Sequence, residues 1–230
     1  NDLSVQLLDT NLTGDISVEM GAVPSFSINL AAAKFDLDKL LSAQESGLAK
    51  VKTTSKTKAT ISVDASTQKD QSTAQASNGV MIPKNISGSV IVSVEALVYR
   101  GQAISDVLIN SELGNGVAKL SQFSAQLPGG SEVTLYGDLS TPKGDPQFSG
   151  NIEAHTNDLR KVTEWLGVKV PKIPKDRLRK ADFRSAIMLT PNEIQVQSLN
   201  LKFDSSRFTG AATVALRSRL GFGANLTLDQ

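Results

Sequence analysis

The chain has 230 residues, a formal net charge of +1 and 40% hydrophobic residues, which suits a globular protein with a substantial core. It contains no cysteine and one histidine, which excludes disulfide scaffolds, cysteine proteases, Fe–S clusters and metal sites built on several cysteines or histidines. The balanced charge and the 5% content of aromatic residues argue against a general nucleic-acid binder.

Residues 1–41 form the first predicted unit, which consists of strands followed by a short helix. The helix is predicted from Asp36 to Ser42, where three leucines lie at helical spacing. The next stretch, 42–85, is rich in Ser, Thr, Lys and Gln and has few large apolar residues. We interpret it as a polar linker whose segment 67–78 is mobile and open to proteases.

Residues 86–230 are predicted to be a region of repeated strands, because apolar and polar residues alternate there. The longest run, 86–98, is apolar at its even positions and mostly polar at its odd ones, with Ile91 and Leu97 as exceptions. Further strands are predicted at 131–139, 147–154, 208–216 and 220–228.

Turn sequences separate these strands and favour antiparallel hairpins. Asn115-Gly116 tolerates the positive φ angles that a type I′ hairpin turn requires. Pro128-Gly129-Gly130, the stretch 141–146 and Pro191-Asn192 are also predicted turns.

The clearest helix is predicted over 157–166, with Asn157 as its N-cap, Asp158 in its first turn and Gly167 at its end. Leu159, Val162 and Trp165 lie on one stripe of this helix. We therefore expect Trp165 to anchor the helix at the end of an apolar sheet face.

A pattern of three strands recurs at 3–41, 120–166 and 198–230. The first two copies end in a capped helix, and Gly14, Gly130 and Gly210 are interpreted as glycines of one equivalent turn. The repeats predict a mainly β fold: an elongated, curved antiparallel sheet that forms an open groove, with a few short helices.

The inner face of such a groove would carry the apolar residues of the alternating strands. The candidate lining residues are Val90, Val92, Val94, Val133, Leu135, Phe148, Ile152, Val214, Leu216, Phe222 and Leu226.

Three stretches resemble the AsmA family of bacterial envelope proteins, in particular its C-terminal region. They are ISGSVIVSVEALVYRGQAISDVLINSELGNGVAKLSQFSAQLPGGSEVTLYGDL, FSGNIEAHTNDLRKVTEWLG and KFDLDKLL. The resemblance implies a curved sheet with a lipid-compatible groove, a periplasmic location and an inner-membrane anchor that lies outside this chain. It also implies a role in phospholipid traffic to the outer membrane or in outer-membrane assembly.

No catalytic constellation stands out, so we expect neither an enzyme nor a cofactor or metal. Ser55 to Lys58 matches S-x-x-K, but its partner motifs are absent. His155 lies on the polar phase of a strand near Glu153, which is typical of a surface histidine.

A basic stretch follows the second helix and allows two interpretations. It is either a solvated connection kept extended by prolines, or a surface that attracts anionic lipid headgroups. The headgroup candidates are Lys169, Lys172, Lys175, Arg177, Arg179 and Lys180.

These patterns favour a non-enzymatic envelope module whose partner is a phospholipid or another lipid with acyl chains. The alternative is a structural or assembly scaffold, in which exposed strand edges bind envelope proteins.

Overall fold

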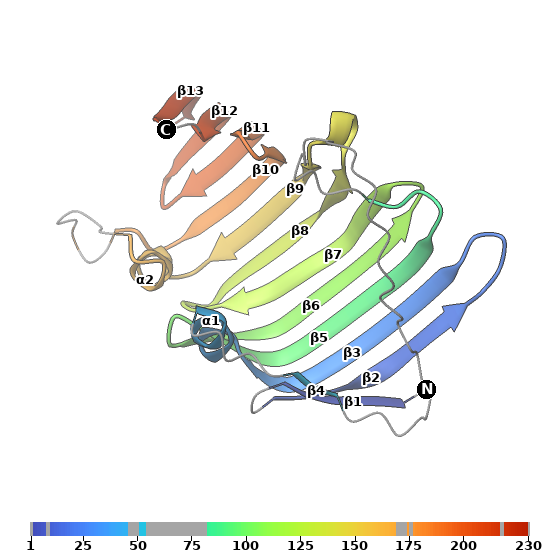
Figure 1. Cartoon of the computed structure of the whole chain (residues 1–230). Coiled ribbons are helices and arrows are strands. Elements are labelled where there is room, and N and C mark those ends of the chain that lie inside the picture. The colour runs from blue at the N-terminus through green and yellow to red at the C-terminus, as the bar shows by residue number, and fades with distance from the viewer. Residues whose placement is uncertain are drawn as a thin grey trace.

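A computed structural model describes residues 2–7, 10–45, 51–53, 82–168, 174, 177–216 and 219–229. In this part of the chain, thirteen strands form a single sheet in the order β13-β12-β11-β10-β9-β8-β7-β6-β5-β3-β2-β1-β4 (Figure 1). The sheet is open, because β13 and β4 lie at opposite edges. The predicted mainly β fold, an elongated, curved and open sheet, is confirmed.

The described elements are mostly strands, with two α-helices and one short 3-10 helix between them. They are β1 (Asp2–Leu7), β2 (Thr10–Glu19), β3 (Ser25–Asp36), α1 (Leu37–Glu45), β4 (Val51–Thr53), β5 (Ser87–Tyr99), β6 (Gln102–Gly114), β7 (Val117–Leu127), β8 (Ser131–Ser140), η1 (Pro142–Gly144), β9 (Gln147–Thr156), α2 (Leu159–Trp165), β10 (Ala181–Thr190), β11 (Glu193–Phe203), β12 (Ser206–Leu216) and β13 (Leu220–Asp229).

One pair of strands departs from the antiparallel pattern. β3 and β5 are parallel, with Ser25 opposite Ser87 and Ala32 opposite Val94. β3 continues directly into α1, and β5 begins at the end of the sheet where β3 began. As a result, α1 lies at the same end of the sheet as the β5–β6 turn (Figure 1).

Residues that pair across neighbouring strands share a face, and the pairing gathers the apolar residues on one face, called here the apolar face. One row of successive partners runs across six strands, and a second runs across five. The first is Val133, Ala154, Phe183, Leu201, Phe208 and Leu228, and the second is Val92, Ile109, Phe123, Leu135 and Ile152.

Bulges explain why the alternation in the sequence is imperfect. In β6, Ile104 and Val107 are both buried although they are three residues apart, and Asp106 between them has a φ of 53°. β5 changes phase beside this point, so that Val94 and Leu97 both contribute to one apolar cluster. Leu97 therefore interrupts the alternation in the sequence, but in the structure its side chain packs with the apolar cluster.

The predicted turns and helices are largely confirmed. Asn115 and Gly116 have φ angles of 53° and 76°, as a type I′ turn requires. The helix predicted over 157–166 is α2, but its N-cap is Asp158, whose carboxylate accepts a hydrogen bond from the Lys161 N–H at 3.2 Å. The first helix extends to Glu45, beyond the predicted end at Ser42.

The strand triplets of the repeat are present, but the three glycines are not equivalent. Gly14 and Gly210 lie inside the middle strands β2 and β12, opposite Leu30 and Leu226, and an added Cβ would collide with the carbonyl of the next strand. Gly130 lies in the β7–β8 turn, with a φ of 63°. The interpretation of all three as turn glycines was wrong for Gly14 and Gly210.

The stretch interpreted as a linker contributes two described elements to the fold. The last turn of α1 lies in it, and β4 pairs with β1 at the edge of the sheet. The segment 67–78, predicted to be mobile, lies outside the described residues. None of the helices that the structure describes is both long and apolar enough to cross a membrane.

Candidate functional site

Helix α2 lies across the strand ends on the apolar face, and its first turn is fixed by backbone contacts. The Leu159 N–H donates to the Arg179 carbonyl at 2.8 Å, and the Arg160 N–H donates to the Leu178 carbonyl at 3.1 Å. These bonds satisfy donors that a helix N-terminus leaves free. They also attach the segment 177–180 to the start of the helix.

The other end of α2 is fixed by Trp165. Its Nε1–H donates to the Tyr99 carbonyl at 3.0 Å, and the two rings meet edge to face with centroids 6.1 Å apart. Arg100 adds a hydrogen bond of 2.5 Å from its guanidinium to the Leu166 carbonyl. Trp165 thus holds the helix end at the β5–β6 turn and packs against the buried apolar cluster, as predicted.

Helix α1 contacts the same turn. The Asp38 carboxylate accepts hydrogen bonds from the backbone N–H groups of Arg100 and Gly101 at 2.8 and 2.9 Å. Asp36 caps α1 by accepting from the Lys39 N–H at 3.0 Å. The acidic pair Asp36 and Asp38 therefore has a structural role, and both helices meet at one turn (Figure 1).

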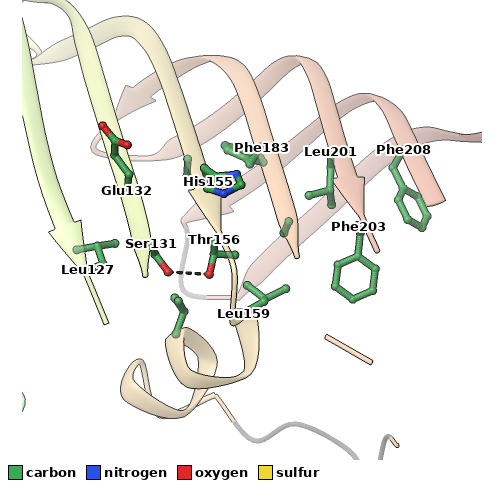
Figure 2. A pocket seen from close by; sticks show the side chains of 13 residues that line it. Leu127, Ser131, Glu132, His155, Thr156, Leu159, Phe183, Leu201, Phe203 and Phe208 are labelled. Carbon is green, nitrogen blue, oxygen red and sulfur yellow. Dashed lines mark hydrogen bonds between the residues drawn. The ribbon is translucent and has the colours of Figure 1, made fainter. Parts of the chain in front are cut away.

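A pocket of about 480 Å³ lies between α2 and strands β7 to β12. Its lining is mostly aliphatic and aromatic, and Figure 2 shows Leu159 at the start of the helix, with Phe203 and Phe208 on neighbouring strands. The lining residues are Leu127, Ser131, Glu132, Ala154, His155, Thr156, Leu159, Val162, Ala181, Phe183, Leu201, Phe203 and Phe208.

The two hydroxyl groups of the lining bond to each other. The Ser131 hydroxyl donates to Thr156 Oγ1 at 2.7 Å, and both residues are buried (Figure 2). Glu132 and His155 alternate with Ser131 and Thr156 along β8 and β9, so their side chains belong to the opposite sheet face. The pocket therefore offers an apolar ligand few polar partners.

The opposite, polar face carries charged pairs near the same strands. His155 Nδ1 lies 2.6 Å from the Asp182 carboxylate, and Arg184 lies 3.2 Å from Glu153. The hydrogen bond with His155 lowers the pKa of Asp182 below its ordinary value. Both members of the histidine pair are about half exposed, at 49% and 55%, as expected of a surface histidine.

Basic residues lie at the rim beside the pocket. Arg179 and Lys180, with Arg177, surround a hollow of about 320 Å³ that also includes Asp204 and Ser205. The Asp204 carboxylate accepts from the N–H groups of residues 178 to 180 at 3.0 to 3.3 Å, which fixes this backbone. The other three headgroup candidates, Lys169, Lys172 and Lys175, lie outside the described residues.

The structure places the eleven predicted groove residues on the apolar face, in different surroundings. Val94 is 7% exposed in the core, and Val92 and Val133 pack against the same cluster. Leu135, Phe148, Ile152, Val214 and Val90 are half-buried, and Leu216, Phe222 and Leu226 are exposed. None of the eleven lines the pocket described above.

Sequence reasoning missed the aromatic side of the pocket. Phe183 comes from β10, which was not among the predicted strands, and Leu201 and Phe203 come from β11, which was predicted only as the first strand of the triplet at 198–230. Alternation at 181–189 and at 199–203 was the available signal. The Ser198 bulge, with a φ of 52°, breaks this signal in β11.

Comparisons with protein-family models, curated proteins and solved structures found no match to this chain. Among the described residues, no cluster of three or more His, Asp or Glu side chains is suited to hold a metal ion. The S-x-x-K stretch at 55–58 lies outside the described residues.

Proposed function

We propose that the chain is a non-enzymatic lipid-handling module that holds an acyl chain in the pocket beneath α2. The observation that carries this proposal is the apolar lining of a pocket of about 480 Å³. Ligand pockets in proteins commonly measure about 300–1,000 Å³. Ten methylenes buried there would contribute about 8 kcal/mol before the entropic cost of binding.

The apolar face provides a path from this pocket to the edge of the sheet. Leu201, Phe208 and Leu228 are successive partners in one row, and Leu228 on the edge strand is 48% exposed. An acyl chain entering along this row would remain in contact with apolar side chains. This arrangement favours entry of an acyl chain from the edge of the sheet along the row, rather than enclosure of the acyl chain by a closing cavity.

The basic rim supports an anionic headgroup. Lys180 directly precedes Ala181, and Asp204 directly follows Phe203, and both of these neighbours line the pocket. A phosphate at this rim would lie beside Arg179 and Lys180, each contributing about 1 kcal/mol near a charged surface. The ligand class is therefore a phospholipid or another anionic lipid with acyl chains.

The resemblance to the AsmA family adds the cellular context to the proposal. We place the module in the periplasm as part of a longer protein that is anchored to the inner membrane. In that setting it would take part in phospholipid transport between membranes or in outer-membrane biogenesis.

The test is lipid binding by a pocket variant and a matched control. Leu201→Glu places a carboxylate in the pocket, whereas Asn200→Glu places it on the polar face of the same strand. We expect Leu201→Glu to weaken binding of a fluorescent fatty acid at least tenfold, because an unpaired charge is costly in an apolar site. Asn200→Glu should bind like the parent chain. Equal binding by both folded variants would contradict the proposal.

A second arm tests the headgroup. The double variant Arg179→Glu and Lys180→Glu should reduce binding to phosphatidylglycerol vesicles and leave binding to phosphatidylcholine vesicles unchanged. An equal loss of binding to both vesicle types would show that the basic rim does not recognise an anionic headgroup.

A structural scaffold is the second candidate function, and one observation favours it. Strand β13 lies at the sheet edge, and each of its residues is exposed. Such an edge can bind another chain through its free backbone groups.

A further inference from the structure

The two edges of the sheet differ in how they are protected. At one edge, β4 is only three residues long. A short edge strand is one device that limits further strand pairing. At the other edge, β13 is ten residues long and its register with β12 runs without a bulge.

Strand β13 lacks the usual protective residues. Its sequence, LGFGANLTLD, has no lysine, arginine or proline. Its apolar side chains all lie on the apolar face, where Leu220 is 60% exposed, Phe222 77% and Leu226 50%. A long, regular and apolar edge of this kind is suited to pair with another strand.

We propose that β13 pairs with β13 of a second copy of this chain, antiparallel and about a twofold axis at Ala224. The choice of a second copy rests on self-complementarity. In this register Leu220 faces Leu228 of the second copy, and Phe222 faces Leu226. The proposal stands independently of the lipid-binding role.

The charges select the same register. Arg219 directly precedes β13 and Asp229 is its last residue, and both are exposed. Pairing centred on Ala224 brings each Arg219 opposite Asp229 of the other copy. Shifting the pairing by two residues keeps the apolar face aligned but separates these charges. Opposite charges across a strand pair stabilise it, and an isologous interface repeats each contact twice.

Pairing in the plane of the sheet leaves both apolar faces on the same side. The row from the pocket to Leu228 would then meet the equivalent row of the second copy. Two pockets would share one continuous apolar surface across the dimer axis.

The first experiment is sedimentation equilibrium of the parent chain and charge variants. We expect a dimer, which Arg219→Asp or Asp229→Arg alone weakens by roughly tenfold, since two ion pairs are lost per dimer. The double variant should restore the dimer, because the charges are exchanged and opposite again. Lys202→Asp on the interior strand β11 is the matched control and should leave the dimer unchanged.

The second experiment uses the absence of native cysteine. Ala224→Cys on the axis should form an intermolecular disulfide on mild oxidation, because paired Cα atoms lie about 4.5–5.5 Å apart, within disulfide range. Ala212→Cys, its partner on β12, should not cross-link. A parent chain that stays monomeric at all concentrations would overturn the proposal. A dimer that ignores the charge variants and leaves Ala224→Cys reduced would also overturn it.

Discussion

The apolar face is covered in one region of the sheet and bare in another. In strands β3 to β7, Ala32, Val94, Ile104, Val107 and Ala125 form a buried cluster, against which Trp165 of α2 packs. In strands β10 to β13, Ala181 is the only buried apolar residue that the structure describes. Both regions show the same alternation in sequence. Alternation therefore identifies which face is apolar, whereas a covering element decides whether that face is buried.

The largest expected effect comes from placing one charge in each region. Val94→Glu buries a carboxylate in the cluster, and we expect it to destabilise the fold by more than about 4 kcal/mol. Phe222→Glu on the bare face should change stability by less than about 0.5 kcal/mol. Urea unfolding measures the free energy of unfolding of both variants. Similar losses for the two would show that the apolar face is equally buried in both regions.

A smaller effect is expected from uncovering the covered region. Trp165→Ala removes the indole from Tyr99 and from the cluster and should cost about 3 kcal/mol, at the low end for tryptophan because the side chain is partly exposed. Trp165→Phe keeps a ring but removes the Nε1–H bond, which should cost about 1 kcal/mol. If thermal melting gives the same melting temperature for both variants, the aromatic ring contributes little to the stability of the fold.

The smallest expected effect lies on the polar face of β10. Because the pKa of Asp182 is lowered in the folded chain, the ionised carboxylate stabilises the fold above the ordinary carboxyl pKa, and this contribution is lost as the pH falls through the lowered value. Asp182→Asn should therefore cost at most a few tenths of a kcal/mol at pH 7, since the pair is exposed. The difference should shrink as the pH falls through the lowered pKa of Asp182. A difference that does not change with pH would assign it to packing.

The elements that depend only on neighbouring residues in the sequence were predicted correctly. The Asn115-Gly116 turn, the capped helix α2 and the strand at 86–98 depend on short stretches of sequence, and all three are present. The N-cap differed by one residue because Asn157 and Asp158 are both good caps, and only the chain direction after β9 distinguishes them.

Long-range features were harder to predict. The parallel pairing of β3 and β5 depends on where the chain returns after α1, which alternation does not encode. The pocket depends on the bulge at Ser198, which brings Leu199 and Leu201 onto the same face as Val196. Such a bulge is defined by the partner strands, so the sequence of β11 alone does not show it.

The parallel pair has a consequence for the order of folding. About 50 residues separate Asp36 at the end of β3 from Ser87 at the start of β5, whereas two residues join β5 to β6. Closing the longer connection costs roughly 3 kcal/mol more in chain entropy than closing a short turn. The hairpins from β5 onward can therefore form among themselves, whereas β3 completes its pairing only after the later strand β5 has been synthesised. During that interval the apolar side of β3, with Phe26, Ile28 and Leu30, is available to chaperones.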